Sequence, residues 1–145
     1  MDISKLHVVI VHFPIALALS AALADILYAA TGKAALKNAG LYCLVLAAIS
    51  AIPTVMAGWE RLESLQANLP ADILSIAITH RNCAFVSLTV LIIAASVRIF
   101  QRNSLRRWWL IGYVILMLLV VGFISATGSY GGMLTHGKDF LSGLF

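Results

Sequence analysis

The chain has 145 residues, of which 61% are hydrophobic and only 11% are charged, and its mean hydropathy is +0.97. A soluble domain usually carries about a quarter of charged residues, so this composition excludes an ordinary water-soluble domain and indicates a protein whose surface faces lipid. The net charge of +4 does not indicate a nucleic-acid partner, because the basic residues lie at the ends of apolar segments and form no continuous stripe.

Four apolar segments are long enough to cross a bilayer as helices, which takes about 20 residues each. Helices are the structure that suits such runs, because backbone groups in lipid must be hydrogen bonded within the segment itself. The predicted spans cover about residues 4–30, 38–59, 79–100 and 105–127. The sequence therefore predicts an all-α fold with one transmembrane domain over residues 1–145, an integral membrane four-helix bundle with short loops.

The links between the spans differ in length and in charge. Two are short, Thr31–Lys37 and Gln101–Ser104, and short links predict antiparallel neighbours. The middle link, residues 60–78, mixes charged and apolar residues, so we expect it to lie along the membrane surface, partly as an amphipathic helix after Pro70.

Lysine and arginine are concentrated around the two short links. The positive-inside rule places these links in the cytoplasm. Both termini and the middle link then face the outer side. For a multi-pass protein of the bacterial inner membrane, that side is the periplasm.

All four histidines collect at the predicted outer end. His7 and His12 lie in the first span, His80 opens the third, and His136 follows the fourth in the glycine-rich segment Thr127–Gly137. The glycines predict a turn that brings His136 back over the mouth of the bundle. Counting residues from the cytoplasmic ends places His12 and His80 at about the same depth, at the outer hydrocarbon boundary.

Three interpretations of these histidines stay open at this stage. A haem b could lie between His12 and His80 with Arg81 near a propionate, in a small b-type cytochrome that passes electrons to a redox partner. One zinc or copper ion could instead be held by His12, His80 and His136. In the third, no cofactor binds and the histidines satisfy backbone groups and water in a structural or assembly subunit of other membrane proteins. Nothing in the sequence supports a hydrolase.

Two charged residues inside the spans share the azimuth of a histidine. Asp25 follows His7 by 18 residues and Arg98 follows His80 by 18 residues, which is about five helical turns. If the histidines face the interior, both charges do so as well, near the cytoplasmic end. A buried ion pair between Asp25 and Arg98 is the economical prediction, and a proton relay through Asp25 is the alternative.

Three stretches together resemble a known bacterial family. They are Leu6–Leu17 with its His-Phe-Pro motif, the pair His80–Arg81, and Thr127–Gly137 with its Gly-Gly-x-Leu-x-His-Gly pattern. In these, nearly the whole chain resembles the inner-membrane proteins grouped as domain of unknown function 2231. The resemblance implies four membrane helices and no established activity. It also implies relatives that occur beside redox domains, which favours the haem interpretation.

Overall fold

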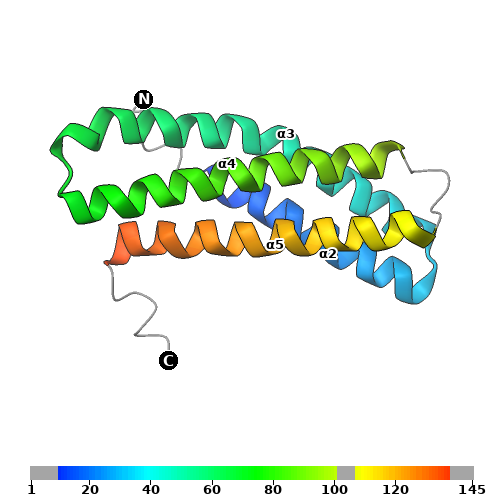
Figure 1. The fold of residues 1–145 in the computed structure, drawn as a ribbon. Helices are drawn as coiled ribbons and strands as arrows, with labels where there is room; N and C mark the ends of the chain where they lie inside the picture. Colours follow the sequence, from blue (N-terminus) through cyan, green and yellow to red (C-terminus); the bar gives the residue numbers. More distant parts are fainter. Residues whose placement is uncertain (1–9, 101–106, 138–145) are drawn as a thin grey trace.

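The computed structural model describes residues 10–100 and 107–137, and this part of the chain is helical throughout. It contains four long helices and one short 3-10 turn. In chain order they are α2 (His12–Thr31), α3 (Ala34–Leu65), the 3-10 turn η1 (Gln66–Asn68), α4 (Ala71–Phe100) and α5 (Arg107–His136). Figure 1 shows the four helices side by side as an elongated bundle.

All four helices have the length and apolar composition of membrane spans. Their outward faces carry large apolar side chains, of which Leu118 is 68% exposed and Phe100 is 87% exposed. In water such a surface would be an aggregation site, whereas in a bilayer it meets hydrocarbon. The chain is therefore a four-helix membrane protein, as predicted.

The helices begin and end at turns that the sequence makes. Gly32 ends α2 in the left-handed region, with φ 67°, and its N–H donates to the Tyr28 carbonyl. A left-handed glycine is a common helix end, because a Cβ there would be strained. Only Gly32 and Lys33 separate α2 from α3, so these two helices form a tight antiparallel pair.

The middle link is much shorter than predicted. The sequence analysis assigned residues 60–78 to a surface-lying segment, but α3 continues to Leu65 and α4 already begins at Ala71. The amphipathic stretch after Pro70 is the first part of α4. A helix of 30 residues is about 45 Å long, which exceeds a hydrocarbon thickness of about 30 Å. Polar residues near these ends are therefore compatible with unbroken helix.

The glycine-rich segment after the fourth span is also helical. It was predicted as a turn from Thr127 to Gly137, yet α5 runs on to His136 and Gly137, with φ 96°, ends it. Glycine within a helix costs only about 0.5–1 kcal/mol relative to alanine, and this segment accepts that cost. Close packing against α4 gives one of these glycines a use, as described below.

Small side chains form the contact between α2 and α3. Ala18, Ala21 and Ala24 of α2 are buried, as are Gly40 and Ala47 of α3. Lipid is as apolar as a leucine side chain, so membrane helices gain little by burying apolar groups and depend on close backbone approach, which small residues permit.

The helices pack in chain order around the bundle. Each of the pairs α2–α3, α3–α4 and α4–α5 is in extensive contact, whereas α5 and α2 touch at only a few positions. The α2–α5 seam is therefore the weakest of the four sides.

Candidate functional site

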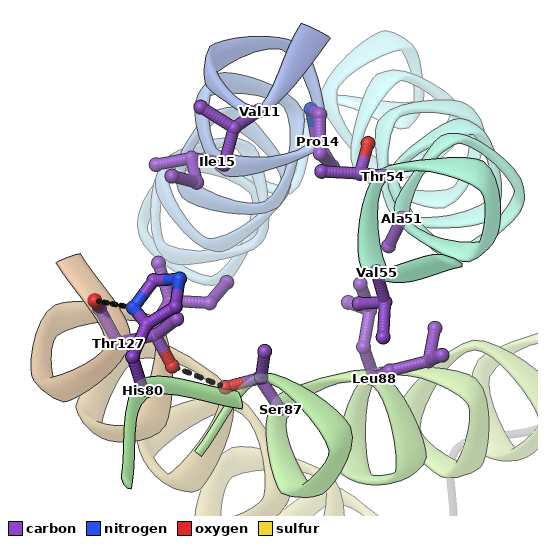
Figure 2. A pocket seen from close by; sticks show the side chains of 13 residues that line it. Val11, Pro14, Ile15, Ala51, Thr54, Val55, His80, Ser87, Leu88 and Thr127 are labelled. Carbon is purple, nitrogen blue, oxygen red and sulfur yellow. Dashed lines mark hydrogen bonds between the residues drawn. The ribbon is translucent and has the colours of Figure 1, made fainter. Parts of the chain in front are cut away.

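A pocket lies among all four helices, near the middle of α3, α4 and α5. Figure 2 shows His80 and Ser87 on one wall with Pro14 and Thr54 across the space from them. Nearly every side chain on its surface is apolar. The lining residues are Val11, Pro14 and Ile15 of the α2 side, Ala51, Thr54 and Val55 of α3, His80, Ala84, Ser87, Leu88 and Leu91 of α4, and Ile124 and Thr127 of α5.

His80 is the one lining residue of the described chain with a side-chain nitrogen. Its Nδ1 lies 2.9 Å from the Thr127 carbonyl oxygen of α5. A carbonyl only accepts, so Nδ1 carries the hydrogen, and in the neutral imidazole Nε2 then holds the lone pair. Figure 2 shows the ring projecting from α4 into the space beside α5 and α2.

Gly131 permits this contact between His80 and α5. A Cβ built on Gly131 would lie 3.2 Å from His80 Cε1 and 3.6 Å from Nδ1. The first distance is tighter than ordinary van der Waals contact, so glycine lets the imidazole lie against the helix. The same turn of α5 holds a hydroxyl pair, because Ser87 Oγ and Thr127 Oγ1 are 3.2 Å apart and link α4 to α5.

His80 lies deeper than the sequence analysis placed it. It was expected at the opening of the third span, but it is nine residues beyond Ala71 in α4, or about 14 Å along the helix. The pocket is therefore at the level of the apolar central part of the bundle.

His12 does not join His80 in the pocket. Its side chain is exposed, whereas its neighbour Val11 lines the pocket with Pro14 and Ile15. Residues of a helix are about 100° apart, so His12 lies about 160° around the helix from Pro14. The predicted clamp of a haem between His12 and His80 is not present in this arrangement.

Arg81, which was expected beside a haem propionate, points elsewhere. Its Nε and Nη2 donate to Asn82 Oδ1, and it does not line the pocket. His7 lies outside the described residues, so its predicted place in the site stays a prediction.

The predicted three-histidine zinc or copper site is not assembled. His136 ends α5 with an exposed side chain, and its Nδ1 lies 2.7 Å from Thr135 Oγ1. It is nine residues beyond Thr127, the residue that His80 contacts, and nine residues of helix span about 14 Å. Within the described ranges no three histidine, cysteine or acidic side chains lie close enough together to hold a metal ion.

A charged cluster occupies the opposite end of the bundle. Arg98 Nη2 donates to Asp25 Oδ1 at 2.7 Å, so the ion pair expected from the residue spacing is present, with side chains only 3% and 14% exposed. Tyr113 donates its hydroxyl to Asp25 Oδ2 at 2.5 Å, and the Arg98 guanidinium lies 5.4 Å from the Tyr113 ring centroid. Arg98 Nη2 also contacts the Lys37 carbonyl at 3.3 Å.

One residue from each helix thus takes part, and Gly40 makes room for them. A Cβ on Gly40 would lie 2.5 Å from Asp25 Oδ1 and 3.0 Å from its Cγ. We call Asp25, Gly40, Arg98 and Tyr113 the charged clasp.

Several of these residues were not singled out from the sequence. Tyr113 and Thr127 are 14 residues apart in α5, close to four full turns, so they share the face that packs on α4. Gly131 was seen only as part of a predicted turn. The signal for Gly40 and Gly131 was available in principle, since glycine within a long apolar helix indicates a close approach by a neighbour.

The family described as "Predicted membrane protein (DUF2231)" matches residues 4–139 of the chain. No curated protein and no solved structure matches it.

Proposed function

We propose that this chain, which belongs to the DUF2231 family of predicted membrane proteins, binds haem b in the four-helix pocket with His80 as the axial ligand. The observation that supports this most directly is the orientation of His80 by the Thr127 carbonyl. Histidines that ligate a metal almost always donate their other ring N–H to a carbonyl, carboxylate or water, which fixes the tautomer and raises the basicity of the ligating nitrogen.

The remainder of the lining suits the faces of a porphyrin. Cofactor pockets are mostly apolar, with a few placed polar groups that fix orientation, and here the polar groups are His80 with the hydroxyls of Thr54, Ser87 and Thr127. These hydroxyls donate within the protein, as in the bonds from Thr54 to the Ser50 carbonyl and from Ser87 to the Cys83 carbonyl. They therefore leave the imidazole as the group that selects the ligand.

The coordination expected from this pocket differs from the one expected from the sequence. Among the described lining residues, His80 alone offers a good ligand for iron. We therefore expect a high-spin ferric haem with one protein ligand, whose reduced form binds carbon monoxide, in place of a low-spin bis-histidine haem. An iron with an open position can bind small molecules as well as pass electrons.

The test is the visible spectrum of protein purified from haem-replete cells. Wild type should show a haem band whose shape is that of a five-coordinate centre, and His80→Ala should lose it. His12→Ala and His136→Ala are matched controls and should keep it, because both side chains are exposed and outside the pocket.

A cavity variant separates ligation from folding. In His80→Gly, free imidazole added to the medium should restore the band, because it can occupy the place of the missing side chain. Colourless wild-type protein from haem-replete cells contradicts the proposal. So does a band that His12→Ala removes and His80→Ala leaves.

We further propose that the Arg98 end faces the cytoplasm and the η1 end faces the periplasm. The support is the density of lysine and arginine near the turn at Gly32 and Lys33 and between α4 and α5 under the positive-inside rule. Reporter fusions at Lys33 and at Gln66 should report the cytoplasm and the periplasm respectively, and the reverse result contradicts this orientation.

A further inference from the structure

The side of the pocket between α2 and α5 is built differently from the other three. The pairs α2–α3, α3–α4 and α4–α5 are in extensive contact, but α2 and α5 touch at few positions. The polar contact that joins these two helices is the Tyr113 hydroxyl on Asp25, in the charged clasp. The clasp lies at the Arg98 end, away from His80.

The two walls of this seam at the pocket are apolar. Val11 and Ile15 line it from the α2 side, and Ile124 lines it from α5. In Figure 2, α2 and α5 face each other across the space that His80 enters, while α3 lies on the other side of the pocket. An apolar gate of this kind offers no hydrogen bonds to water or to a hydrated solute.

The depth of the pocket decides what lies outside the seam. His80 is nine residues inside α4 and Ile124 is 17 residues inside α5, about 14 Å and about 26 Å from the first residues of these helices. At such depths the surroundings of a membrane helix are hydrocarbon. The seam therefore faces lipid tails.

We infer that the pocket opens sideways into the bilayer between α2 and α5, and that its ligand enters as a lipid-dissolved molecule. The clasp holds α2 and α5 together at one end, so the free part of α2 can move without separating the bundle. The identity of the ligand as haem b rests on the proposed function, and haem b is apolar enough to reach the site in this way. The route itself rests on the packing of the seam.

The route can be tested without any ligand, by asking which quencher reaches the pocket. Leu88→Cys, in a Cys43→Ala/Cys83→Ala background, places a bimane label on the α4 wall. The protein is reconstituted in phosphatidylcholine vesicles, with doxyl groups at the middle of the acyl chains or with iodide in the buffer. We expect doxyl lipid to quench the label several-fold more strongly than iodide. If this variant does not fold, Val55→Cys on the α3 wall serves the same purpose.

Narrowing the seam provides the matched comparison. Adding Ile15→Phe to the labelled protein should lower quenching by doxyl lipid, because Ile15 lines the gate. Adding Leu19→Phe, one turn further along α2 on an exposed face outside the pocket, should not. Stronger quenching by iodide, quenching by neither agent, or equal effects of the two phenylalanines would each overturn the inference.

The outcomes for route and ligand are separate. Quenching by doxyl lipid in a protein that binds no haem keeps the lateral opening and removes haem as the ligand. Haem binding in a protein whose pocket is quenched by iodide keeps haem and removes the lateral opening.

Discussion

The two ends of the bundle solve the same packing problem with different means. At the Arg98 end, every helix contributes to the charged clasp, and Asp25 receives hydrogen bonds from both Arg98 and Tyr113. At the His80 end, α4 and α5 are joined by His80 and by the Ser87–Thr127 pair. There α2 contributes apolar side chains to the pocket.

This difference shows where rigidity is needed in a membrane bundle. Helices in lipid are held by close packing and polar contacts, because burying apolar surface gains little there. A charged network that fixes all four helices at one end leaves the other end free to keep a pocket and a loosely packed seam. Glycine occurs at both ends, with Asp25 above Gly40 and His80 above Gly131, so equivalent substitutions can compare them.

The largest effect is expected from breaking the ion pair of the clasp. Asp25→Asn and Arg98→Gln should each cost about 3–5 kcal/mol of stability, because each leaves the partner charge buried without compensation. The double variant should be more stable than the sum of the two losses predicts. Thermal unfolding in detergent of wild type, both single variants and the double variant completes the cycle. Strictly additive losses would show that the two residues do not act as a pair.

A smaller but still clear loss is expected from Gly40→Ala. The new methyl group would meet the Asp25 carboxylate at 2.5 Å, and this carboxylate is held in place by Arg98 and Tyr113. Overpacking of a fixed neighbour typically costs about 1–3 kcal/mol. Gly122→Ala is the control, because nothing lies within 4 Å of a Cβ there, and it should lose nothing. Equal unfolding midpoints for the two variants would show that the clasp adapts.

Helix number and the Asp25–Arg98 pair could be predicted because they depend on composition and on residue spacing within a helix. Residue spacing also held the answer for His12, which lies 13 residues before Asp25. That separation places the two about 140° apart around α2. With Asp25 facing the interior, His12 faces outward. The sequence analysis compared depths and did not make this comparison of azimuths.

Helix ends and partners across helices could not be predicted in the same way. Glu60, Glu63 and the glycines after Thr127 suggested loops, because polar residues and glycine often end membrane spans. Here the helices continue beyond the expected boundaries. The contact from His80 to the Thr127 carbonyl depends on how α4 and α5 are aligned along their axes, and no pattern within either segment records that alignment.

The smallest effect is expected at the pocket end, from Gly131→Ala. A methyl group there would approach His80 Cε1 at 3.2 Å, but this imidazole borders a pocket and can shift by a few tenths of an ångström. Replacing a helical glycine by alanine gains about 0.5–1 kcal/mol where there is space, and the shift of His80 offsets part of that gain. The control is Gly128→Ala, one turn earlier with nothing within 4 Å of its Cβ. We expect Gly131→Ala to be slightly less stable than Gly128→Ala and clearly more stable than Gly40→Ala. Because the substitution weakens the hydrogen bond that orients the imidazole, it should also shift the haem band while Gly128→Ala leaves it in place. A loss of stability as large as that of Gly40→Ala would show that the His80 end is as rigid as the clasp, and the contrast between the two ends would fail.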